Sequence, residues 1–134
     1  IYSRVTIVTP ADEDVIEQIC KQLNRLIPVI KVAHLSVDDA IEYEIGLIKV
    51  YIEDKNRSDF INIVAQAKAT IMDVNDKIYT VKIDGTEKEV QTFAELIRPY
   101  GIKEFVRSGR VAITKGNQFS NFKTKKEEQI KVEL

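Results

Sequence analysis

The sequence predicts an α+β protein built from two related units. Segments of alternating β-branched residues and segments with apolar residues at every third or fourth position follow one another along the chain. Over residues 40–114 their order is β-α-β-β-α-β, which is typical of the ferredoxin-like arrangement of two helices on one face of a mainly antiparallel sheet. Residues 1–36 show only β-α-β, so the first unit is represented by the second half of the same pattern.

The composition is that of a globular domain. The chain has 134 residues, of which 44% are apolar and 31% charged, and its formal net charge is −1. This charge gives no general attraction to nucleic acid or to an anionic membrane, so neither is an expected partner. Apolar runs extend for only a few residues and no signal peptide is visible, so we expect no membrane span and a cytoplasmic protein.

The first unit is predicted to contain two strands around one helix. Residues 1–9 are alternating and β-branched, as is the run 29–35. The helix between them starts with three acidic residues after Pro10, which suits the positive end of a helix dipole, and Pro28 ends it. Its buried face is predicted to consist of Val15, Ile16, Ile19, Leu23 and Leu26.

The second unit starts with a long strand over residues 41–53. A helix follows with Asn56 or Ser58 as the candidate N-cap, and its apolar side is formed by Phe60, Ile61, Val64 and Ala67. The segments 70–74 and 77–83 are predicted to form a β-hairpin that turns at Asn75-Asp76.

The end of the second unit carries clear helix signals. Thr86 and Glu89 have the spacing of a capping box, and Pro99 with Gly101 stops the helix. The last extended segment, 102–113, is interrupted at Gly109, which is typical of a β-bulge. Residues 115–134 are expected to form a polar, lysine-rich tail.

No residue pattern predicts catalysis, a metal site or a bound cofactor. Cys20 and His34 are the sole cysteine and histidine, and Cys20 falls in a helical apolar pattern that predicts a packed small hydrophobe. The glycines stand singly, which argues against a phosphate-binding loop. The adjacent acidic pairs 38–39 and 127–128 are interpreted as solvated charge, because adjacency alone gives no catalytic geometry.

The densest candidate site is a basic block over residues 98–110. Strand alternation predicts Lys103, Phe105 and Arg107 on one side of the strand. Two interpretations stay open: a solvated sheet edge whose cations prevent edge-to-edge pairing, or a contact with another subunit. The residues selected for an interface or structural role are Arg98, Pro99, Gly101, Arg107 and Gly109.

Four separated blocks resemble the regulatory (small) subunit of acetohydroxyacid synthase, also called acetolactate synthase. The first joins 4–9 to 14–26, and the others are 44–50, 69–74 and 93–110. Their order and spacing match the family over residues 3–116. Four blocks in one order make the resemblance specific.

The resemblance implies the second half of an ACT domain at 1–36 and a ferredoxin-like domain at 37–114, in a homodimeric subunit without catalysis or cofactor of its own. It implies a catalytic partner that uses thiamine diphosphate, Mg and FAD in branched-chain amino-acid biosynthesis. The subunit would activate that partner and mediate feedback inhibition by valine. The family's effector-binding motif would lie before Ile1, so no residue of this chain is assigned to effector binding.

An alternative interpretation is a ligand-sensing effector domain of a transcription regulator. It would need a DNA-binding domain, and the sequence shows no helix-turn-helix. A small stand-alone enzyme is a third alternative, which turnover without a partner would support.

Overall fold

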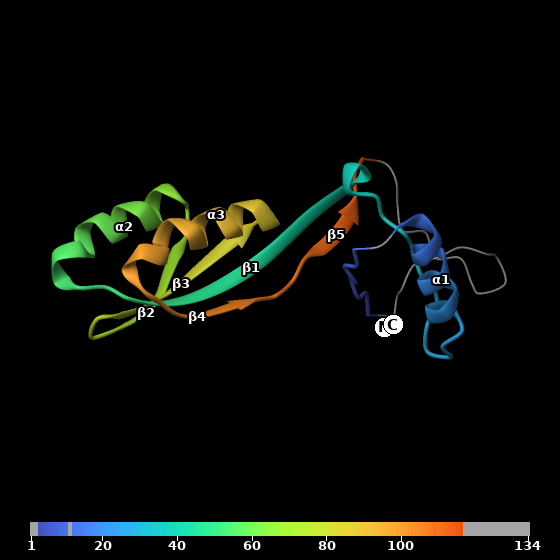
Figure 1. The fold of residues 1–134 in the computed structure, drawn as a ribbon, viewed down its shortest axis with the longest axis horizontal. Helices are drawn as coiled ribbons and strands as arrows, with labels where there is room; N and C mark the ends of the chain where they lie inside the picture. The colour runs from blue at the N-terminus through green and yellow to red at the C-terminus, as the bar shows by residue number, and fades with distance from the viewer. Residues whose placement is uncertain (1–2, 11, 117–134) are drawn as a thin grey trace. The chain divides into compact units, whose positions relative to one another are not determined.

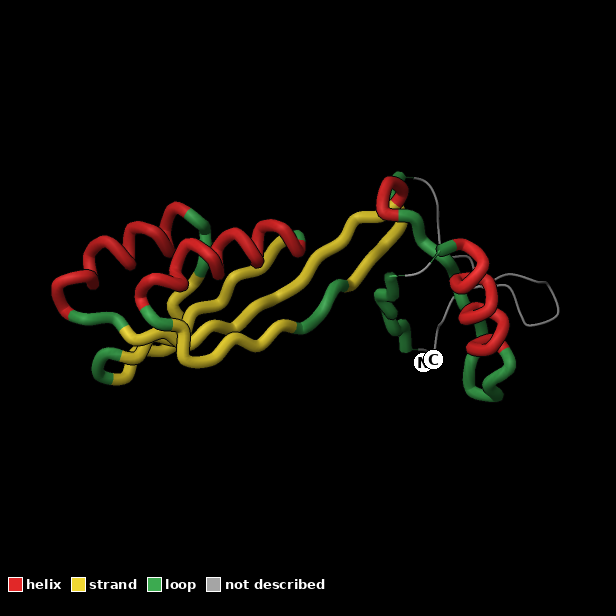
Figure 2. Tube along the Cα trace, viewed as in Figure 1, coloured by secondary structure: helices red, strands yellow, loops and turns green. Residues whose placement is uncertain are grey.

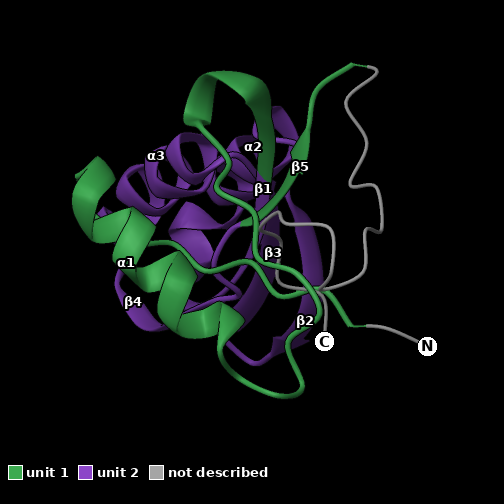
Figure 3. Ribbon diagram, turned by 90° about the vertical axis from the view of Figure 1, so that its right-hand side faces the viewer, with its two compact units in different colours: residues 1–42, 111–134 green, residues 43–110 purple. Residues whose placement is uncertain are grey.

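The computed structural model describes residues 3–10 and 12–116. Most of the expected tail at 115–134 therefore lies outside the described residues. The chain divides into two compact units, one containing residues 43–110 and the other containing the residues up to 42 and from 111 onward (Figure 3).

The second unit has the ferredoxin-like topology that the sequence predicts. Its strands form one antiparallel sheet in the order β2-β3-β1-β4, and α2 and α3 lie on the same face of it (Figures 1 and 2). The predicted β-α-β-β-α-β order and the hairpin are confirmed, but the turn is at Asp76 and Lys77 because Asn75 pairs with Ile78 at the end of β2. The bounds are β1 Ala40–Tyr51, α2 Arg57–Gln66, β2 Thr70–Asn75, β3 Ile78–Gly85, α3 Glu87–Ile97 and β4 Ile102–Arg107.

The core of this unit follows from strand alternation. Successive side chains of a strand point to opposite faces, and from Glu44 to Tyr51 the residues of β1 alternate between buried and exposed. The inward residues pack under the helices, where the ring of Phe60 meets Tyr79 and Tyr100 edge-on at centroid distances of 5.4 and 5.8 Å. The core consists of Ile48, Val50, Ile52, Phe60, Val64, Tyr79, Val81, Ile83, Val90, Phe93, Ala94 and Ile97.

The helix starts differ from one another in how they are capped. The predicted capping box of α3 is confirmed, because Thr86 Oγ1 accepts from the Glu89 amide at 3.3 Å while Glu89 Oε2 accepts from the Thr86 amide at 2.8 Å. The predicted side-chain cap of α2 is wrong. Asn56 is in the cap position but has helical φ and ψ of −101° and −4°, because a 3-10 turn runs directly into the helix. A capping side chain needs the extended conformation there.

The first unit contains α1, Glu13–Asn24, whose start is capped by Asp12 Oδ1 accepting from the Val15 amide at 3.0 Å. Cys20 packs with Val29 and Val32, which confirms its predicted role as a small hydrophobe, and burial raises the pKa of its thiol. Leu26 lies beyond the end of α1 and Val15 lies in its first turn. Both are exposed, so their predicted place on the buried face is wrong.

The two strands predicted for the first unit do not form as regular strands. Residues 29–36 have no regular secondary structure, and the described part of 1–9 contains only an isolated bridge at Arg4. A strand is stable only where a neighbouring strand accepts and donates its backbone hydrogen bonds. Two side-chain hydrogen bonds join the described residues of 1–9 to Ala112, from Arg4 Nη2 to the Ala112 carbonyl and from the Ala112 amide to Thr6 Oγ1.

A short strand, β5 at Val111–Thr114, pairs with β1. None of the described helices is long and apolar enough to cross a membrane.

Candidate functional site

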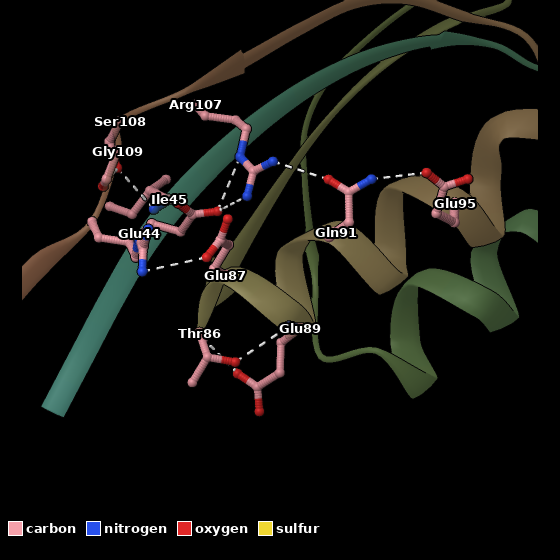
Figure 4. A network of polar contacts seen from close by, with 11 residues as sticks. Glu44, Ile45, Thr86, Glu87, Glu89, Gln91, Glu95, Arg107, Ser108 and Gly109 are labelled. Carbon is pink, nitrogen blue, oxygen red and sulfur yellow. Dashed lines mark hydrogen bonds and ion pairs between the residues drawn. The ribbon is translucent and has the colours of Figure 1, made fainter. Parts of the chain in front are cut away.

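The basic block 98–110 brings Arg107 into a network that joins three elements of the second unit (Figure 4). Arg107 Nε donates to Oε1 of Glu44 on β1 at 3.0 Å, and Nη2 forms an ion pair with the same oxygen. Arg107 Nη1 donates to Oε1 of Gln91 on α3 at 3.0 Å. One guanidinium therefore ties β4 both to the neighbouring strand and to the helix above the sheet.

Burial makes this ion pair significant for stability. The side chain of Glu44 is 3% exposed and that of Arg107 is 30% exposed. A carboxylate at such a position is costly unless it is paired and hydrogen-bonded, and the planar guanidinium supplies several donors in a fixed geometry. Arg107 also lies over the ring of Phe105, with 5.5 Å between its Cζ and the ring centroid. Arg107 thus stabilises the fold of this unit.

Arg98 lies at the other end of the same network. Gln91 Nε2 donates to Glu95 Oε1 at 2.8 Å, and Arg98 Nη2 donates to that oxygen at 2.8 Å. The structure therefore connects two of the residues selected from the sequence. Their environments differ, because Arg98 is 65% exposed and forms a helix-surface pair of the kind that contributes little to stability.

Pro99 and Gly101 build the corner between α3 and β4. Pro99 lies in the 3-10 turn Arg98–Tyr100, which follows α3 directly. Gly101 has a φ of +101°, its amide donates to the Arg98 carbonyl, and its carbonyl accepts from the Tyr51 amide at 3.2 Å. A side chain at Gly101 would meet nothing within 4 Å, so the backbone conformation is what requires glycine.

Gly109 lies in the interruption between β4 and β5, both of which pair with β1, and it has a φ of +78°. At this interruption the side chain of Ser108 takes the place of a backbone partner for β1. Ser108 Oγ accepts a hydrogen bond from the Ile45 amide at 3.0 Å and donates one to the Gly109 carbonyl. Gly109 therefore allows the chain to turn out of one strand before it enters the next.

The register of β1 against β4 shifts between Lys49 and Val50, leaving Lys103 without an opposite residue. Because of this register shift, Lys103 lies on the opposite side of the sheet from the one predicted. Lys103 Nζ lies 6.0 Å from the ring centroid of Tyr51, on the face away from the helices, and not with Phe105 and Arg107. The cations of the block do not converge on one site, because they contact different partners. Arg98 pairs with Glu95, Lys103 lies by Tyr51, Arg107 pairs with Glu44 and Arg110 pairs with Glu87.

The face of the sheet opposite the helices presents apolar side chains that were not among the residues selected from the sequence. Leu47 is opposite Val106 in the register, and both are exposed, as is Ile45. A salt bridge of 3.1 Å between Lys49 Nζ and Glu104 Oε2 lies beside them. We call Ile45, Leu47, Lys49, Tyr51, Glu104 and Val106 the open sheet face. The sequence indicates this face by apolar residues at the strand positions that point away from the core, such as Ile45 and Leu47.

The polar side chains of the Arg107 network bond to one another within the second unit. The network contains carboxylates, amides and guanidiniums that already bond to one another, without a histidine or a cysteine. Within residues 3–10 and 12–116, no group of three or more histidine, cysteine or acidic side chains is placed to hold a metal ion.

The family model and the relatives found by sequence comparison carry the same description. A family model described as the small subunit of acetolactate synthase matches residues 43–116. The chain is 39% identical over 116 residues to the probable acetolactate synthase small subunit of Archaeoglobus fulgidus, covering 87% of this chain and 72% of the relative. It is also 39% identical over 112 residues to the acetolactate synthase small subunit of Aquifex aeolicus, covering 83% of this chain and 58% of that protein.

A solved structure agrees with the sequence comparisons. The acetolactate synthase small subunit of Thermotoga maritima superposes with a TM-score of 0.72 at 29% identity, covering 81% of this chain and 68% of the other. The family match includes β1 from Tyr43 onward, β4, the Arg107 network and the open sheet face. The chain therefore belongs to the family of acetolactate synthase small subunits.

Proposed function

We propose that this chain is a non-catalytic regulatory subunit that binds the catalytic subunit of acetolactate synthase, raises its activity and takes part in feedback inhibition by valine. The observation that carries the proposal is the family match over residues 43–116 together with the relatives that match 83% or more of the chain. The exposed apolar residues of the open sheet face support a role in contact.

The remaining parts of the proposal concern the setting of this subunit. The catalytic partner would carry thiamine diphosphate, Mg and FAD in branched-chain amino-acid biosynthesis in the cytoplasm, and this chain would carry no cofactor. The proposed domain limits are 1–36 for the second half of an ACT domain, 37–114 for the ferredoxin-like domain and 115–134 for the tail. The residues that contact valine are not assigned.

We also propose that the subunit is a homodimer and that the open sheet face contributes to the contact between its two copies. A two-fold contact needs a surface that is complementary to itself. The open sheet face has an apolar centre at Leu47 and Val106, beside the paired opposite charges of Lys49 and Glu104. Such a surface can bury its apolar centre and exchange ion pairs with a second copy.

A charge at the centre of the open sheet face is expected to separate the copies. Leu47→Glu would place two carboxylates in the buried centre, so the dissociation constant of the dimer should rise by about tenfold or more. Light scattering coupled to size-exclusion chromatography measures the mass. Ile61→Glu on the exposed side of α2 is the matched control, and circular dichroism checks that both variants fold. An unchanged mass for folded Leu47→Glu would contradict this use of the face.

Association with the catalytic subunit is tested by sedimentation velocity of the two purified proteins, alone and mixed. The proposal expects a faster-sedimenting species in the mixture. Its absence at micromolar concentrations of both proteins would contradict the proposed function and favour the sensor-domain alternative.

A further inference from the structure

Both outer strands of the sheet in the second unit carry an irregularity. The strand order β2-β3-β1-β4 makes β2 and β4 the outer strands. A register shift between Ile71 and Asp73 leaves Met72 without an opposite residue in β3. On β4 the unmatched residue is Lys103. Because such an extra residue twists an edge strand and hinders the pairing of a further strand, two copies are not expected to join edge to edge.

The open sheet face contains rows that cross from β1 to β4. One row is apolar, since Leu47 is opposite Val106. The next row carries opposite charges, since Lys49 is opposite Glu104 and their side chains form the 3.1 Å salt bridge. Rows on one face are about 7 Å apart, because only alternate residues of a strand share a face.

A third row joins a cation to an aromatic ring. Lys103 Nζ on β4 lies 6.0 Å from the centroid of the Tyr51 ring on β1, a distance at which the ring face attracts a cation. In each of the three rows, therefore, the side chain from β1 is complementary to the side chain from β4.

This complementarity selects one two-fold arrangement of two copies. An axis parallel to the strands and between β1 and β4 places β1 of each copy over β4 of the other, row over row, so Lys49 faces Glu104 of the second copy. An axis over β1, or one across the strands at this row, would place Lys49 over a second Lys49. An axis between β1 and β3 would place it over Thr80, which carries no charge.

We propose that two copies of this chain stack through the open sheet face about a two-fold axis parallel to the strands and between β1 and β4, with Lys49 of each copy paired to Glu104 of the other. The apolar row and the cation–ring row lie on either side of these ion pairs. Stacked sheets lie about 10 Å apart with their strands within about 30° of each other, a separation that side chains of both faces fill. This inference rests on the homodimer proposed above and adds the arrangement of its copies.

Opposite charge reversals in two separate chains test the arrangement. Lys49→Glu would bring carboxylates together across the contact, and Glu104→Lys would bring ammonium groups together, so the dissociation constant of each variant dimer should rise by about tenfold or more. Mixing the two variants restores both opposite-charge pairs between the copies, although the like charges within each copy remain. The mixed dimer should therefore dissociate within about threefold of the parent dimer and form in excess over both variant dimers.

Native mass spectrometry of ¹⁵N-labelled Lys49→Glu with unlabelled Glu104→Lys separates the three dimers by mass, and circular dichroism checks that each variant folds. Glu53→Lys and Lys55→Glu are the matched control pair, because they reverse an exposed 3.1 Å salt bridge outside the open sheet face. The control variants should dimerise like the parent chain and mix in statistical proportion.

The outcomes separate this arrangement from the homodimer itself. Statistical mixing of folded Lys49→Glu with Glu104→Lys, or no dimer in their mixture, would overturn the arrangement while a dimeric parent chain would still support the homodimer. A monomeric parent chain would contradict both proposals.

Discussion

Arg107→Ala is expected to lower the free energy of unfolding by about 3 kcal/mol, because it leaves the buried carboxylate of Glu44 without its cation. The variant also loses the hydrogen bond to Gln91 and the contact with the ring of Phe105. Urea unfolding followed by circular dichroism measures the change.

Two comparisons show whether this loss comes from the buried charge. Arg98→Ala removes an exposed arginine from the other end of the network and should cost no more than about 0.5 kcal/mol. Adding Glu44→Gln to Arg107→Ala removes the unpaired charge and should recover part of the lost stability. If Arg107→Ala unfolds like the parent chain but no longer binds the catalytic subunit, Arg107 is a contact residue and its assignment as a stabilising residue is wrong.

Phe60→Ala is expected to lower the free energy of unfolding by about 3–5 kcal/mol, since it removes a fully buried ring from the centre of the core. The cavity would lie beside Tyr79 and Tyr100, whose edge-on contacts with Phe60 would also be lost. Thermal and urea unfolding both measure this effect.

Ile61 is 39% exposed, so its predicted place with Phe60 on the apolar side of α2 is wrong. Ile61→Ala is therefore the matched control for Phe60→Ala, because it truncates the next residue of the same helix at an exposed position. It should cost about 1 kcal/mol or less. Similar losses for the two variants would contradict the assignment of Phe60 to the core and of Ile61 to the surface of α2.

Sequence reasoning predicted the second unit well because its signals are local. The alternation of residues 41–53, the capping box at Thr86 and Glu89, and the stop at Pro99 each act within a few residues, and the structure contains the elements that they predict. In the first unit the same alternation predicted two strands that do not form. Alternation indicates a half-buried strand only where a neighbouring strand completes the ladder, and this depends on residues distant in the sequence.

The Arg107 network could be predicted only in part. Arg107 was selected from its basic block, but its partner Glu44 is 63 residues away in the sequence. The sequence gives one local indication for Glu44, because Glu44 occupies the same alternating, inward-facing positions of β1 as Ile48 and Val50. A single carboxylate in an inward phase requires a cation, although the sequence does not specify which one. The register shift at Lys49 and Val50, which moves Lys103 to the other face, had no such signal.

The measurement that tests the proposed regulatory role most directly is acetolactate formation by the cognate catalytic subunit as this chain is titrated in, with and without valine. A regulatory subunit should form no acetolactate alone and should give a saturable rise in the rate of the catalytic subunit. Valine is expected to lower the rate of the mixture, whereas a valine-insensitive rise would contradict the proposed part of this chain in feedback inhibition. An unchanged rate at concentrations where the two proteins sediment as a complex would contradict the proposed function.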